Sequence, residues 1–196
     1  MGTRHLICIM KDGEYKLAQY GQWDGYPSGQ GLDILDFLRK SNLQRFSENV
    51  SKLSFSTDEA IEKVWKECGA DDSGYVTFRV VEKVKNMRPE ISRDCGADIL
   101  SIIRESKPED LMLKNSLDFA KNSLFCEWAY VIDLDKNTFE IYQGFNQEPL
   151  SSDERFYFDG KPDEDGYYPV RKVGVYFLSS LPTKLRFLKD FEKDEE

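Results

Sequence analysis

Two strand-turn-strand patterns, one toward each end of the chain, constrain the fold more than any other feature of the sequence. Side chains in residues 3–10 alternate between two faces, with His5 and Ile7 on one face and Leu6 on the other. Lys11-Asp12-Gly13 has turn chemistry, and the extended pattern resumes over residues 14–20. The second pattern pairs extended segments at 125–133 and 138–143 around a turn at 135–137, and another extended segment covers 169–178. The sequence therefore predicts two β-hairpins and one additional strand.

Helical patterns fill the region between the hairpins. Apolar spacing predicts helices from Leu32 to Leu38 and from Leu43 to Leu53, with a break near Ser41-Asn42. A third predicted helix begins at the capping box Ser56-Thr57-Asp58-Glu59 and ends at Cys68-Gly69, and Asp71-Asp72-Ser73-Gly74 then breaks the chain. A fourth covers 78–87, and a fifth begins at the Ser92-Arg93-Asp94 cap and runs to Arg104. Two more are predicted, one over Asn115 to Ser123 and one after Pro182. We predict an α+β fold in a single domain, 1–196, with an antiparallel sheet built from the N- and C-terminal hairpins and helices packed on it.

Charge and cysteine usage exclude several classes of function. The chain has 36 acidic and 27 basic side chains, a net charge of -9, so a broad nucleic-acid surface is not expected. The longest apolar runs are strand-sized, far below the roughly 20 residues of a membrane span, and no signal-peptide pattern is present, so we expect a cytoplasmic protein. The four cysteines form no CxxC pair and His5 is the only histidine, which predicts reduced thiols, no metal site and no cofactor.

The densest cluster of polar and aromatic side chains lies between Gln19 and Gly31. Four of the 13 glycines fall between Gly21 and Gly31, where they accompany large rings, a pattern that indicates an ordered loop rather than a flexible linker. Amide side chains donate and accept hydrogen bonds, and aromatic rings offer stacking faces. The candidate ligand-binding residues are His5, Gln19, Gln22, Trp23, Asp24, Tyr26, Gln30, Arg93 and Trp128. The alternative is a rigid structural turn whose polar groups satisfy the backbone.

Three of these candidates lie outside the loop. His5 would approach Gln19 and the Trp23 loop if the first two strands pair, although a lone histidine in a strand is more often a core group than a catalyst. Arg93 stands at a predicted helix start, where a cation is disfavoured, so it faces either an anion or solvent. Trp128 shares a strand face with Tyr130.

The runs Met1 to Ile7, Ala18 to Gly31 and Phe125 to Asp135 resemble a family of proteins without assigned activity found in phages, bacteria and fungi. The resemblance implies, as a candidate ligand, a nucleotide-like signal sequestered from a host defence system. The same hairpin, aromatic-Asp loop and later strand also look like the sheet of the N-terminal-nucleophile amide hydrolases, which would make Thr3 or Cys8 the nucleophile.

Three functional hypotheses follow. The leading one is a non-catalytic protein that binds a small molecule, nucleotide-like if the resemblance holds, in a pocket formed by the Gln19 to Gly31 loop, His5, Arg93 and Trp128. The second is an amide hydrolase of the N-terminal-nucleophile type. The third is an acidic protein-interaction or inhibitor module that approaches a basic partner through its negative charge.

Overall fold

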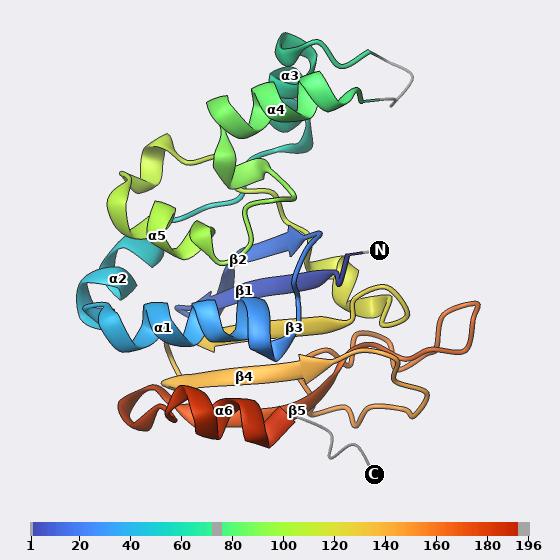
Figure 1. Ribbon diagram of the computed structural model, residues 1–196. Coiled ribbons are helices and arrows are strands. Elements are labelled where there is room, and N and C mark those ends of the chain that lie inside the picture. Colours follow the sequence, from blue (N-terminus) through green and yellow to red (C-terminus); the bar gives the residue numbers. More distant parts are fainter. Residues whose placement is uncertain (1, 72–75, 192–196) are drawn as a thin grey trace.

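A five-stranded sheet with helices on one face forms the centre of the molecule, as the computed structural model shows for residues 2–71 and 76–191 (Figure 1). The strands are β1 (His5–Lys11), β2 (Glu14–Gly21), β3 (Trp128–Asp133), β4 (Thr138–Gln143) and β5 (Arg171–Phe177). The helices are α1 (Leu32–Lys40), α2 (Leu43–Val50), α3 (Asp58–Cys68), α4 (Phe78–Met87), α5 (Asp98–Glu105) and α6 (Lys184–Phe191). The predicted α+β class is confirmed.

The strand order is β2-β1-β3-β4-β5, which leaves β2 and β5 at the edges of the sheet. Both predicted hairpins form, β1 with β2 and β3 with β4, and β5 adds to β4 antiparallel. The contact between the hairpins differs from the predicted all-antiparallel sheet, because β1 and β3 run parallel, with His5 opposite Trp128. A parallel pair requires a long crossover connection, and here the helical region between β2 and β3 provides it.

The two faces of the sheet are covered differently. On one face, Ile7, Tyr130 and Phe139 pack against apolar side chains of α1, α2, α5 and α6. On the other face, Leu6 and Val131 pack against the loop residues Phe156 and Val170 and against Ala120 of a short 3-10 helix rather than against an α-helix. The alternation read in residues 3–10 therefore separates two real cores.

Helices α3 and α4 form a third, smaller core beyond the edge strand β2 (Figure 1). Thr57 begins α3 by accepting a hydrogen bond from the amide of Ala60, and Gly69, at φ 105°, ends it. Thr77 caps α4 in the same way. The predicted helices at 58–68 and 78–87 are confirmed, whereas most of the predicted break at 71–74 lies outside the described residues.

Three predicted boundaries are wrong for local reasons. Helix α5 begins at Asp98 rather than near Ser92, because Gly96, at φ 51°, interrupts the helical path. The predicted helix at 115–123 is only a 3-10 turn over Leu117–Lys121. Strand β3 begins at Trp128 rather than at 125, because the amide of Cys126 donates back to the carbonyl of Asn122 in a turn.

Candidate functional site

The Gly21–Gly31 segment is a tightly bonded corner between β2 and α1. The amide of Gly25 donates to the Thr3 carbonyl at 3.0 Å, and the Tyr130 hydroxyl donates to the Gly25 carbonyl at 2.8 Å. The amide of Gln30 donates to the Asp24 carbonyl at 2.9 Å, and Pro27–Gly31 then forms a π-helical turn that continues into α1. The prediction of an ordered loop is confirmed.

Polar side chains of this corner serve mainly to hold it in place. The Tyr20 hydroxyl donates to the side-chain oxygen of Gln22 at 2.6 Å, and the Trp23 indole N–H donates to Asp94 at 2.8 Å. The side-chain oxygen of Gln30 accepts from the amide of Ala97 at 2.6 Å. The bonds of Trp23 and Gln30 join the corner to residues 94–97, and all three of these candidate binding residues have partners within the protein.

Asp24 and Tyr26 lie on the outside of the corner. Tyr26 is 51% exposed, and Asp24 is exposed with a positive φ of 55°. Trp128 lies on β3, across β1 from β2, and contacts the ring of Phe191 edge-on at 6.3 Å. The structure therefore does not bring these three candidates together with Gln19.

His5 is buried beneath the corner with 1% of its surface exposed. Its ring lies against Gly21, where a Cβ atom would clash with the imidazole, and a Cβ atom at Gly25 would lie 2.8 Å from the His5 Cβ. Neither ring nitrogen makes a hydrogen bond of normal geometry with a described residue. Burial lowers the pKa of His5 from 6.5 to about 4, against a smaller opposing effect of the Thr3 backbone. The imidazole is therefore neutral at pH 7.

A cavity of about 520 Å³ lies beside the edge strand β2, and we call it the edge cavity. It is bounded by β2, by α3 and α4, and by the segments around residues 91–93 and 114–119. Its lining comprises Gln19, Tyr20, Trp65, Val81, Ile91, Ser92, Arg93, Lys114, Asn115, Ser116, Asp118 and Phe119. Gln19 and Arg93 are the two predicted binding residues that belong to this lining.

Hydrogen bonds to β2 fix the walls of the edge cavity. The amide of Ser116 donates to the Ala18 carbonyl at 2.9 Å, and the Tyr20 ring meets the Phe119 ring edge-on at 4.9 Å. The Gln19 side-chain nitrogen donates to the Ser92 carbonyl at 3.2 Å. The Gln19 side-chain oxygen is buried without a hydrogen-bond partner among the described residues. The edge cavity therefore has an ordered frame and an unsatisfied acceptor in its lining.

Trp65, Lys114 and Phe119 were missed as site residues because nothing near them in the sequence indicates a site. Trp65 belongs to the apolar stripe of α3 with Ile61 and Val64, and such a stripe indicates core packing rather than a site. The other two residues approach β2 only through the tertiary fold.

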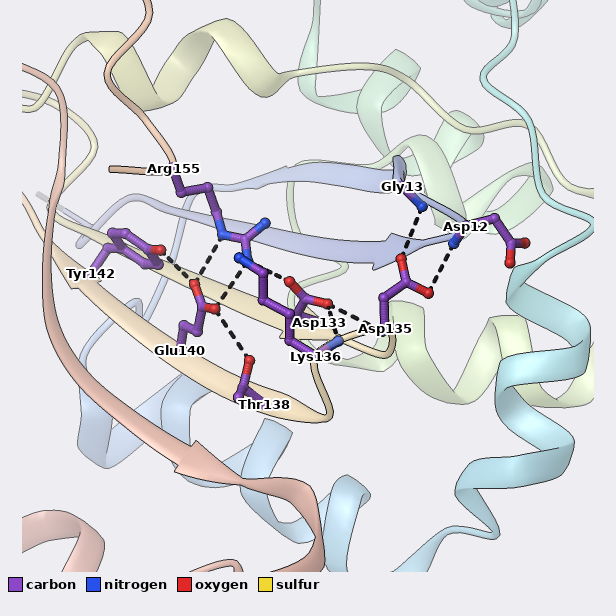
Figure 2. A network of polar contacts seen from close by, with 9 residues as sticks. All are labelled: Asp12, Gly13, Asp133, Asp135, Lys136, Thr138, Glu140, Tyr142 and Arg155. Carbon is purple, nitrogen blue, oxygen red and sulfur yellow. Dashed lines mark hydrogen bonds and ion pairs between the residues drawn. The ribbon is translucent and has the colours of Figure 1, made fainter. Parts of the chain in front are cut away.

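A second polar cluster, missed by the sequence analysis, lies on the loop-covered face of the sheet (Figure 2). The Arg155 guanidinium donates to Glu140 at 2.9 Å and to Asp133 at 2.5 Å. The Tyr142 and Thr138 hydroxyls also donate to Glu140, at 2.5 and 3.1 Å. Burial alone would raise the pKa of Glu140, but the bonds from Arg155 and the hydroxyls hold it below its usual value.

The Arg155 cluster has the properties of a structural clamp. Its charged atoms are paired, and Arg155 joins the long loop that follows β4 to strands β3 and β4 (Figure 2). Nearby, Asp135 accepts hydrogen bonds from the amides of Asp12 and Gly13 at 3.0 and 2.9 Å, which links the two hairpin turns. These contacts hold the loop against the sheet.

The candidate nucleophiles of the hydrolase hypothesis are both buried. Thr3 is 3% exposed and Cys8 is fully buried, and burial raises the pKa of the Cys8 thiol far above its usual value. All four cysteines are buried free thiols. Within the described residues, no group of three or more His, Cys, Asp and Glu side chains is placed to bind a metal ion.

Comparison with protein-family models, curated proteins and solved structures returned no match for this chain. No helix within the described residues combines the length and hydropathy that a transmembrane segment needs. The geometry of the edge cavity is therefore the main basis for a functional proposal.

Proposed function

We propose that this protein binds a small organic molecule in the edge cavity without transforming it. The observation that carries the proposal is the lining itself, where three aromatic side chains and Gln19 border a hollow of about 520 Å³. Ligand pockets typically have volumes of about 300–1,000 Å³ and combine apolar walls with a few polar groups. The edge cavity fits this description.

The chemistry of the lining favours binding over catalysis. General acid-base and nucleophilic catalysis use a histidine, an accessible thiol or an activated hydroxyl or carboxylate. The single histidine is buried and lies outside the lining, as do the buried thiols. Asp118, the one carboxylate in the lining, forms an ion pair with Lys121 at 2.8 Å. Burial of Thr3 and Cys8 does not favour the amide-hydrolase hypothesis.

Native mass spectrometry of freshly purified protein, beside its denatured mass, tests whether a small molecule is bound. We expect extra mass that disappears on denaturation. In parallel, ligand-observed NMR with a fragment library tests the location of the site through Val81→Trp, which places a large ring in the cavity wall on α4. The matched control, Val173→Trp, changes an exposed valine on β5, outside the lining.

Fragments that bind the unmodified protein and Val173→Trp but not Val81→Trp would support the proposal. Equal binding by both variants would exclude the edge cavity as the site. The absence of both a bound mass and any fragment hit would refute the proposal as a whole.

A further inference from the structure

The edge cavity is cationic in a protein that carries a net charge of -9. Arg93 and Lys114 contribute positive charge to its lining, and the charge of Asp118 is shared with Lys121. The side chain of Arg93 is 55% exposed and lies 4.0 Å from Asp94, at the limit of an ion pair. Lys114 has no ion-pair partner among the described residues. Both cations are therefore available to an anionic group in the cavity.

Further positive charge surrounds the Tyr20 hydroxyl. Burial raises the pKa of Tyr20, while the charges of Arg4 and Arg93 act in the opposite direction, which places both guanidinium groups in the electrostatic environment of this hydroxyl. The Arg4 guanidinium stacks over the Phe125 ring at 4.5 Å, and its buried Nε atom has no hydrogen-bond partner among the described residues. Arg4, although outside the lining, therefore adds positive charge near the Tyr20 side of the cavity.

Aromatic side chains supply stacking surfaces in the same lining. Tyr20 and Phe119 are already paired edge-on, so their exposed surfaces have a fixed orientation. Trp65 on α3 is half-buried, because one part of its side chain packs against the third core while the residue also lines the edge cavity. Because an indole in a cavity wall attracts planar rings and cations, Trp65 favours a flat ligand.

The buried oxygen of Gln19 requires a donor. The orientation of the Gln19 amide is determined by the Ser92 carbonyl, which only accepts hydrogen bonds and therefore takes the amide nitrogen as its donor. The remaining oxygen is an acceptor in a residue that is only 4% exposed. Leaving a buried acceptor unpaired costs about 1–3 kcal/mol, so a small rotation of the Gln19 side chain that turns this oxygen toward a ligand N–H or O–H group would recover part of that cost.

We propose that the ligand of the edge cavity is a planar aromatic anion, with its ring against Trp65, a ring N–H or O–H donor toward Gln19, and a carboxylate or phosphate toward Arg93 and Lys114. The proposal rests on the proposed function and specifies the class of molecule that the edge cavity takes. Guanidinium and ammonium groups bind both oxyanions by charge-assisted hydrogen bonds.

Isothermal titration calorimetry of the full chain tests the proposal with matched charged and neutral probes. Adenosine 5′-monophosphate and uridine 5′-monophosphate represent aromatic phosphates, and indole-3-acetate represents aromatic carboxylates. Adenosine, uridine and indole-3-acetamide are their neutral counterparts, and inorganic phosphate lacks the ring. We expect at least one aromatic anion to bind about tenfold or more tightly than its neutral counterpart and than inorganic phosphate. The identity of the tighter anion distinguishes a phosphate from a carboxylate ligand.

Variants assign the contributions of the side chains. Arg93→Gln with Lys114→Gln is expected to weaken the charged probe about tenfold or more and to leave the neutral probe unchanged. Lys107→Gln is a control for loss of surface charge, because Lys107 is exposed and outside the lining.

Trp65→Ala is expected to weaken the binding of charged and neutral probes alike. The chain has three tryptophans, so the indole N–H signal of Trp65 can be assigned by NMR with Trp65→Phe and should shift on binding.

Each of the other outcomes overturns a different part of the proposal. Neutral probes that bind as tightly as charged ones would refute the inference that the ligand is an anion and would leave the proposed function intact. Binding of inorganic phosphate alone would refute the inference that the ligand has an aromatic ring. If no probe binds, the ligand class is wrong, and the mass and fragment measurements then decide separately whether the edge cavity binds any small molecule.

Discussion

The buried His5 predicts a specific loss of stability in mild acid. In the folded protein its pKa is lowered from 6.5 to about 4. As the pH falls below 6.5, His5 therefore becomes protonated in the unfolded chain while it stays neutral in the folded chain, which favours unfolding. A pKa that differs by one between the folded and unfolded states corresponds to about 1.4 kcal/mol of stability. His5 alone should therefore lower the free energy of unfolding by about 3 kcal/mol between pH 6.5 and pH 4. Above about pH 7.5 the contribution is constant, because both states are then deprotonated at His5.

Urea unfolding of the unmodified protein and of His5→Phe, from about pH 7.5 to about pH 4.5, isolates this contribution. Carboxylates titrate equally in both proteins, so their effect cancels in the difference between the two curves. Phenylalanine keeps a planar ring against Gly21 and cannot take up a proton. We expect His5→Phe to gain stability relative to the unmodified protein as the pH falls.

A stability difference that does not vary with pH would refute this reasoning and would mean that the imidazole is hydrated or hydrogen-bonded in solution. NMR offers an independent check, because the chain has one histidine and its imidazole signals are unambiguous. Those signals should not titrate above about pH 5 in the folded protein.

Three further predictions concern the packing of the molecule. Arg155→Met leaves two buried carboxylates unpaired and should lower the free energy of unfolding by about 3–5 kcal/mol in urea titrations, whereas Arg171→Met, at an exposed pair, should cost less than about 1 kcal/mol. Gly21→Ala should destabilise the fold by about 1–3 kcal/mol through contact with His5, and adding His5→Ala should recover part of that loss in a double-mutant cycle. The four buried thiols should react with a thiol reagent only as fast as the protein unfolds; a rapid phase in native buffer would contradict their burial.

The elements that depend on neighbouring residues could be predicted from the sequence. Alternation around the Asp12-Gly13 turn was sufficient for the first hairpin, and both turn residues take the positive φ values that this turn requires. Thr57 and Gly69 likewise mark the ends of α3 in the sequence. The parallel contact of β1 with β3 leaves no local trace, because it depends on how a long helical crossover is packed.

The candidate site was only partly predictable for the same reason. Gln19 and Arg93 were identified by their unusual local settings, but the edge cavity also needs α3, α4 and the 114–119 segment, which meet only in the folded chain. Gln22, Trp23 and Gln30 have hydrogen-bond partners within the protein, which is what the alternative of a rigid turn predicts. The Arg155 cluster was missed because Arg155 lies in a loop, and nothing near it in the sequence shows that it reaches Asp133 and Glu140.

The central position of β1 has a consequence for the order in which the chain is made and folded. The amide of Arg4 donates to the carboxylate of Glu127, which is 123 residues further along the chain. At a synthesis rate of about 5–20 residues per second, the first hairpin, complete at Gly21, therefore waits about 5–21 s on the ribosome before its neighbour β3 begins at Trp128. During that interval, one side of β1 lacks its strand partner, and both apolar faces of the hairpin are without much of their cover. Nascent chains that end before β3 should be bound by chaperones and cleaved readily by proteases, and protection should appear once β3 and β4 have emerged.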